Sequence, residues 1–249
     1  MTDSLDPAAR LHGLLDYCRR NNGNHQLASQ WGSYLQVSPD SVDYVQALAQ
    51  MTLLPGQMRA AFATLTDRGV PIPFAFFLEP LPTIENALAF GVQNQAGPVS
   101  QFVQQYSEGQ VDRVLSASAI LRDYAASKVS DADLLDTVEV TGTELADLLA
   151  DDDTLEPDVR ELLHALADGL RRSVQTYKMT GAEGVARERD LLVGRLRMNT
   201  GLSEHVRNHP KVVEVVGRFL ERTTMVATFF TTAVDASVDV QKIIQQITG

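Results

Sequence analysis

The stretch PKVVEVVGRFLERTTMVATFFTTAVDASVDVQKIIQQI, from Pro210 to Ile247, decides the fold class of this chain. Apolar residues recur in it every three or four positions, which predicts one amphipathic helix of about ten turns. Its apolar stripe is broad, because three neighbouring lines of apolar side chains run along the helix. Such a stripe must be covered by the rest of the protein, by a partner or second copy, or by lipid.

The remaining sequence repeats the signals that begin and end helices, so we expect an all-α protein. The fold predicted is a bundle of about nine to eleven helices with a long C-terminal amphipathic helix. In the first 66 residues, helix starts are predicted at Asp6-Pro7, Ser38-Pro39 and Pro55. The helix from Asp40 to Met51 is expected to pack through three apolar residues, which are Val42, Val45 and Leu48.

Three segments are expected along the chain. Residues 1–66 predict an N-terminal unit of four helices, and residues 83–249 predict a C-terminal helical bundle. Residues 67–82, DRGVPIPFAFFLEPLP, hold four prolines, which predict an apolar connector without a regular helix. This connector is either buried across a junction of helical layers or exposed as a hydrophobic docking patch. A single continuous domain over 1–249 stays open as an alternative.

The second half of the chain contains the clearest helix pattern. Leu155 to Met179 shows helical spacing, and the capping-box spacing Thr180-Gly-Ala-Glu183 then opens a second helix that runs to about Asn199. Because the turn between them is so short, the two predict an antiparallel helical hairpin. Residues 136–142 could hold a few extended residues. The spacing Thr141-Gly-Thr-Glu144 then predicts a capping box that opens a further helix.

Charge is unevenly distributed in this acidic protein of net charge −11. Residues 128–170 hold thirteen acids against two bases, whereas residues 171–222 hold eleven bases against six acids. The overall acidity argues against a nucleic-acid partner. We expect the basic block to dock against the acidic block, within the chain or between subunits.

No catalytic, cofactor-binding or metal site is predicted. His205 and His209 have the spacing of two metal ligands on a helix, but no glutamate follows the first histidine as in zinc peptidases. No phosphate-binding loop, nucleophile elbow or dinucleotide-binding motif occurs. Cys18 is the single cysteine and is expected to be structural. The sequence therefore leans away from an enzyme without excluding one.

The expected location is the cytoplasm. The first ten residues are acidic and lack an apolar run, and no uncharged apolar window is long enough for an ordinary membrane span. Four lysines against seventeen arginines suggest a bacterial source with a GC-rich genome.

The leading hypothesis is a non-enzymatic helical protein that acts through protein–protein contacts, as an oligomerising scaffold, adaptor or regulatory subunit. A membrane-active effector of a bacterial toxin or defence system, which would release its C-terminal helix, is one alternative. An enzyme or small-ligand binder with a pocket between helices is another. The candidate interaction residues are Phe219, Val226, Phe229, Phe230, Ile243, Phe74, Phe76 and Phe77.

Overall fold

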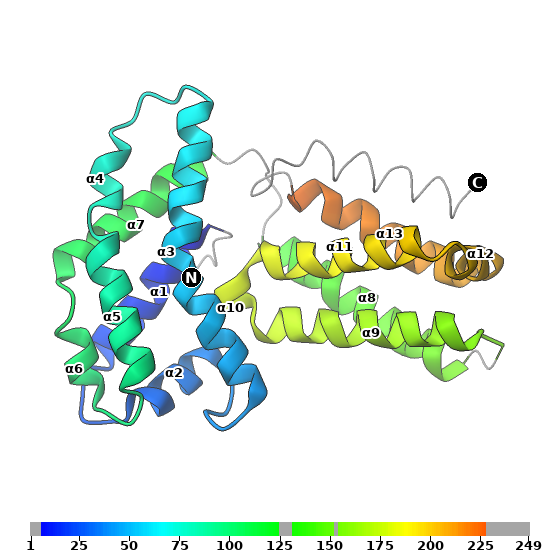
Figure 1. Ribbon diagram of the computed structural model, residues 1–249, viewed down its shortest axis with the longest axis horizontal. Coiled ribbons are helices and arrows are strands. Elements are labelled where there is room, and N and C mark those ends of the chain that lie inside the picture. The colour runs from blue at the N-terminus through cyan, green and yellow to red at the C-terminus, as the bar shows by residue number, and fades with distance from the viewer. Residues whose placement is uncertain (1–5, 125–130, 152–153, 228–249) are drawn as a thin grey trace. The chain divides into compact units, whose positions relative to one another are not determined.

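The computed structural model describes residues 6–124, 131–151 and 154–227, and over these ranges the chain is all-α with no strand. This confirms the predicted fold class. Thirteen helices are formed in the described part, and ten of them have nine residues or more (Figure 1). Their bounds are α1 Pro7–Arg20, α2 Leu27–Leu35, α3 Val42–Asp67, α4 Phe74–Leu78, α5 Leu81–Gln93, α6 Val99–Val103, α7 Glu108–Asp123, α8 Asp131–Asp151, α9 Pro157–Gln175, α10 Tyr177–Thr180, α11 Ala182–Met198, α12 Thr200–Asn208 and α13 Pro210–Ala227.

The chain forms two compact units. The N-terminal unit contains Met1–Ala125 together with Lys178–Gly181, and the C-terminal unit contains Ala126–Tyr177 and Ala182–Gly249. The division into residues 1–66, 67–82 and 83–249 stays a prediction.

Helix α1 lies at the centre of the N-terminal unit and packs on α3 and α7. It begins as predicted, with Pro7 in the first turn and the Asp6 side chain accepting a hydrogen bond from the Ala9 N–H at 2.8 Å. Its buried face consists of Leu11, Leu14, Leu15 and Cys18. Burial raises the pKa of the Cys18 thiol to about 12, which fits the structural role expected for this cysteine.

A second part of this core surrounds Trp31 of α2, which is fully buried. The Trp31 ring meets the Phe102 ring of α6 edge-on, with centroids 5.2 Å apart. Gly91 of α5 faces the same indole, and a Cβ on this glycine would lie 2.4 Å from a Trp31 ring carbon. A larger residue at position 91 would therefore displace the tryptophan.

Helix α3 corrects two predictions. It runs unbroken through Pro55, where a new helix was expected to begin. The fixed φ of proline fits a helix, and Pro55 is buried together with Leu54 and Met58, whose burial offsets the lost backbone hydrogen bond. Val42 and Val45, expected to pack inward, are 72% and 63% exposed, and Tyr44 and Ala47 are buried instead.

The connector over 67–82 also differs from its prediction, because Phe74–Leu78 forms the short helix α4 and α5 begins at Leu81. Prolines 73 and 80 flank α4 instead of interrupting it, since proline is tolerated before or within the first turn of a helix.

Helices α8, α9, α11 and α13 form the main core of the C-terminal unit. Helix α8 is continuous where extended residues and a new helix start were predicted. The Thr141 hydroxyl donates to the Thr137 carbonyl at 2.7 Å, so this threonine bonds back into the helix instead of capping a new one. Val138 and Leu145 are buried on either side of Thr141, and their burial favours one helix.

The predicted helical hairpin is present. Helices α9 and α11 run in opposite directions side by side, with the single turn of α10 between them (Figure 1). Helix α13 is described from Pro210 to Ala227, and its apolar stripe is buried in the described part at Val212, Val216, Phe219 and Leu220. Residues 228–249 lie outside the described part. The prediction that the helix continues to Ile247 is not tested there.

Candidate functional site

The aromatic residues of α4 divide into two groups. The Phe74 and Phe77 rings lie 5.3 and 5.9 Å from the Phe62 ring of α3 and hold α4 against that helix. Phe76 is 53% exposed, and the Arg113 guanidinium lies over its ring, 5.1 Å from the centroid. Two of the three predicted docking residues thus contribute to packing, and only Phe76 presents a mostly exposed ring.

Among the candidates predicted in the C-terminal helix, Phe219 is fully buried in the C-terminal unit. It is therefore part of the core of its own chain. The side chain of Val226 and the whole of Phe229, Phe230 and Ile243 lie outside the described part. Their predicted role in contacts stays a prediction.

His205 and His209 bind separate carboxylates at the start of α9. The Nδ1 atom of His205 lies 3.0 Å from both carboxylate oxygens of Asp158, and His209 Nε2 contacts Glu156. The Asp158 hydrogen bond raises the pKa of His205. In the described ranges no group of three metal-ligating side chains occurs. These contacts join the C-terminal end of α12 to the start of α9.

We predicted that the basic block, residues 171–222, docks on the acidic block, residues 128–170. In the described part of the chain, Arg218 makes such a contact. Arg218 of α13 forms ion pairs with Glu144 of α8 and, one turn away on its own helix, with Glu214. The Glu144 hydrogen bond raises the pKa of Arg218 further. This contact helps to hold α13 on α8.

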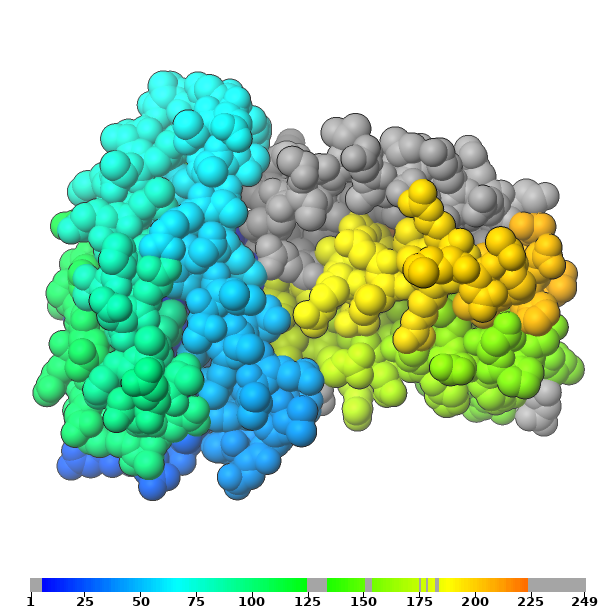
Figure 2. All heavy atoms as spheres, viewed as in Figure 1, coloured from blue at the N-terminus to red at the C-terminus, as the bar shows by residue number. Residues whose placement is uncertain are grey.

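The most unusual surface of the N-terminal unit is the solvent-facing side of α3. We call it the α3 outer face and define it by Val42, Val45, Ala49, Thr52, Leu53, Gly56, Ala60 and Ala63, all of which are exposed. These residues fall on one stripe of the helix, about 32 Å long. All eight residues are uncharged, and the charged Arg59, whose side chain is 41% exposed, lies at the margin of the stripe and pairs with Glu85 of α5. Atoms of α3 form part of the face shown in Figure 2.

Side-chain size changes along the α3 outer face. The N-terminal half carries the two exposed valines, and Leu53 near the middle is 52% exposed. The C-terminal half carries only Gly56, Ala60 and Ala63, and a Cβ added to Gly56 would meet no atom within 4 Å. Side chains of the N-terminal half therefore project further from the α3 helix than those of the C-terminal half.

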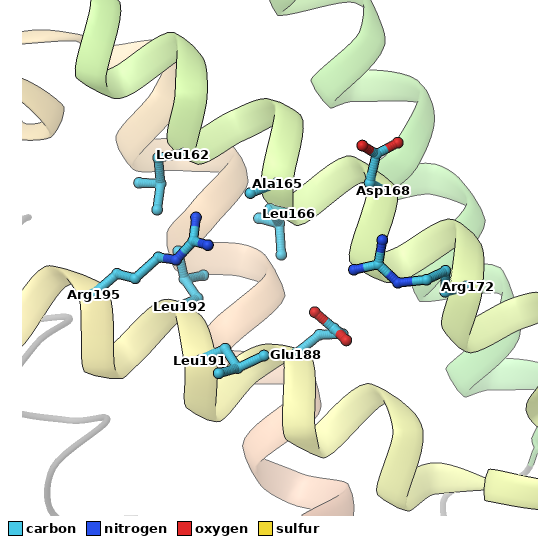
Figure 3. A pocket seen from close by; sticks show the side chains of 9 residues that line it. All are labelled: Leu162, Ala165, Leu166, Asp168, Arg172, Glu188, Leu191, Leu192 and Arg195. Carbon is cyan, nitrogen blue, oxygen red and sulfur yellow. The ribbon is translucent and has the colours of Figure 1, made fainter. Parts of the chain in front are cut away.

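A groove between α9 and α11 in the C-terminal unit has a volume of about 260 Å³ (Figure 3). Its apolar walls come from both helices, and Arg172, Arg195 and Asp168 stand at its edge. Glu188 of α11 points from its helix into the space beside Arg172 and is only 7% exposed. The apolar lining residues are Leu162, Ala165, Leu166, Leu191 and Leu192.

Sequence reasoning missed both of these features. Val42 and Val45 were assigned to the core because their spacing fits an apolar face, but α3 is apolar on both faces and spacing alone does not tell which face is covered. Glu188 lies in a charged run, EGVARERD from Glu183 to Asp190, where an acid is normally solvated. Glu188 is distinguished only by its contact with Gly169 of α9, which becomes visible in the structure.

Comparison of the chain with protein families, with curated proteins and with solved structures finds no match. In the described part, no helix combines the length and the apolar character needed to cross a membrane.

Proposed function

We propose that this protein is a self-associating scaffold, which acts through protein–protein contacts made first with a second copy of itself. The observation that carries the proposal is the α3 outer face, an uncharged, partly apolar stripe in a chain of net charge −11. Large exposed apolar stripes on soluble proteins mark interaction sites. A stripe without charges pairs with an identical stripe at no electrostatic cost.

The size gradient selects the orientation of the two helices. In an antiparallel pair centred between Thr52 and Leu53, Val42 lies opposite Ala63 of the second copy and Val45 lies opposite Ala60. Ala49 then lies opposite Gly56, so each larger side chain meets a smaller one. Small residues let two helices approach closely and let side-chain ridges enter grooves. A parallel pair would place valine on valine and glycine on glycine, which leaves gaps.

The antiparallel pair has a two-fold axis, so both copies use the same surface. Such an isologous contact closes at the dimer. Burial of the exposed valines and Leu53 would supply the driving force, at about 25 cal/mol for each Å² of apolar surface removed from water.

A charge-pair experiment tests this arrangement. Val45→Asp should abolish the dimer, because it places a carboxylate in the apolar contact. Ala60→Arg should do the same. The double variant Val45→Asp/Ala60→Arg should recover the dimer, since each aspartate then faces an arginine of the other copy. The two residues lie fifteen positions apart, about 22 Å along one helix, so they do not pair within a chain.

The readout is solution mass by light scattering over a range of protein concentrations. The wild type should approach twice the chain mass of 27.3 kDa. The matched control is Val140→Asp, which adds the same charge at a valine of α8 that is 38% exposed. A wild type that stays monomeric at all concentrations, or single variants that remain dimeric, would contradict the proposal.

A further inference from the structure

Glu188 is a mostly buried acid whose carboxylate faces the groove (Figure 3). The residue is only 7% exposed, and no hydrogen bond or ion pair joins its side chain to another in the described part of the chain. A carboxylate held in a narrow groove keeps only part of its hydration. A cation that enters the groove would supply the missing interactions.

Gly169 provides the space that this carboxylate occupies. A Cβ on Gly169 would lie 2.1 Å from Glu188 Oε2, so a larger residue there would require the end of the Glu188 side chain to shift. Glycine in the interior of a helix costs about 1 kcal/mol relative to alanine. Helix α9 thus carries a destabilising residue at the one position that seats Glu188.

The walls of the groove restrict what can bind beside the carboxylate. Leucines of α9 and α11 offer an apolar surface, and the volume of about 260 Å³ is below the range of typical drug-sized pockets. Arg172, Arg195 and Asp168 stand at the edge of the groove, where the two arginines can attract an anion and Asp168 offsets part of their charge (Figure 3). Glu188 is suited to bind the cationic end of a small molecule, and Arg172 or Arg195 is suited to bind its anionic end.

We propose that the groove between α9 and α11 binds a small zwitterionic molecule. Its ammonium group donates hydrogen bonds to Glu188, its short apolar body contacts Leu166 and Leu192, and its anionic end meets Arg172 or Arg195. This site lies apart from the α3 outer face in the chain, and the inference goes beyond the proposed self-association without depending on it.

Calorimetric titration of the full chain with three matched probes tests the proposal. The probes are ε-aminocaproate, which carries both charges, hexylamine, which carries only the ammonium group, and caproate, which carries only the carboxylate. We expect ε-aminocaproate to bind most tightly, hexylamine more weakly, and caproate least. Equal binding of all three probes, or binding of none, would overturn the proposal.

Two variants locate the site. Glu188→Gln removes the charge with little change of shape and should weaken ε-aminocaproate binding by about ten- to one-hundred-fold. Gly169→Ala should weaken it by displacing the carboxylate. The matched control is Glu161→Gln, which neutralises an exposed acid of α9 that does not line the groove. Unchanged binding by Glu188→Gln would contradict the assignment.

A structural ion pair between Glu188 and Arg172 is the competing explanation. It predicts that Glu188→Gln and Arg172→Gln lower the melting temperature equally and that no probe binds saturably. Our proposal predicts instead that ε-aminocaproate binds saturably and that Glu188→Gln leaves the melting temperature of the unliganded chain nearly unchanged, because no ion pair is lost.

Discussion

Arg10 of α1 donates a hydrogen bond from Nη1 to the Met179 carbonyl oxygen, 2.5 Å away and 169 residues further along the chain. Arg10 is 6% exposed, and its guanidinium also lies close to Gly181, which has a left-handed φ of 52°. One arginine thus anchors the turn at Lys178–Gly181 to the first helix of the N-terminal unit. Glycine is needed at 181 both for its φ and for the nearby guanidinium.

The variant Arg10→Met should lower the free energy of unfolding by about 2 to 3 kcal/mol, because a hydrogen bond from a charged, buried donor is lost. Urea unfolding monitored by tryptophan fluorescence would report it, since the single tryptophan lies in the same unit. The control Arg20→Met removes an exposed ion pair with Asp16 and should cost less than about 1 kcal/mol. Equal effects of the two variants would contradict the anchoring role.

Alanine substitutions at two glycines should change the stability of the fold in opposite directions. Gly91→Ala forces a Cβ to within 2.4 Å of the Trp31 ring and should destabilise the fold by about 1 to 3 kcal/mol. Gly142→Ala adds a methyl group to open space within α8 and should stabilise it by about 0.5 to 1 kcal/mol. Thermal unfolding measures both changes, and a stabilising Gly91→Ala would show that the Trp31 packing is wrong.

The His205–Asp158 pair should make stability depend on pH. The pKa of His205 is raised by its hydrogen bond to Asp158. Partial burial opposes the lowering of the Asp158 pKa, but the hydrogen bonds from His205 and from the Val159 N–H outweigh it. The stabilisation from histidine is complete below its unfolded pKa of about 6.5 and is lost as the pH rises through the raised folded value. The stabilisation from Asp158 is present above its unfolded pKa of about 3.9 and is lost as the pH falls through the lowered value.

His205→Gln should therefore lower the melting temperature most between about pH 4 and pH 6.5, and progressively less at higher pH. Circular dichroism melts of both proteins at matched ionic strength would measure the difference. A difference that is the same at low and high pH would contradict a charged pair.

Cys18 should be unreactive in the native protein. Its thiol is fully buried and has a pKa raised to about 12, so almost no thiolate exists at neutral pH. A maleimide dye should label the chain only after denaturation. Rapid labelling of the native chain would show that α1 opens readily.

The helical class and most helix positions could be predicted from sequence, because Pro7 and the apolar spacing in α9 act locally. Pro55 and Thr141 were wrongly predicted to begin new helices, because each carries the local signal of a helix start. Burial of the neighbouring Leu54 and Val138 keeps each helix continuous instead. The carboxylate partners of His205 and His209 could not be predicted, since they lie about fifty residues earlier in the chain. Whether a residue is exposed depends on the whole fold. The spacing of apolar residues in the sequence therefore could not predict the α3 outer face.

The antiparallel α3 contact is tested most directly by cysteine crosslinking at two positions. In the proposed dimer, position 53 lies next to the two-fold axis, whereas the two copies of position 45 lie about 22 Å apart. With a short bis-maleimide, Leu53→Cys should give a covalent dimer of twice 27.3 kDa, and Val45→Cys should stay monomeric. Cys18 supplies no background, because it is buried. Equal crosslinking at both positions, or none at position 53, would contradict the antiparallel contact.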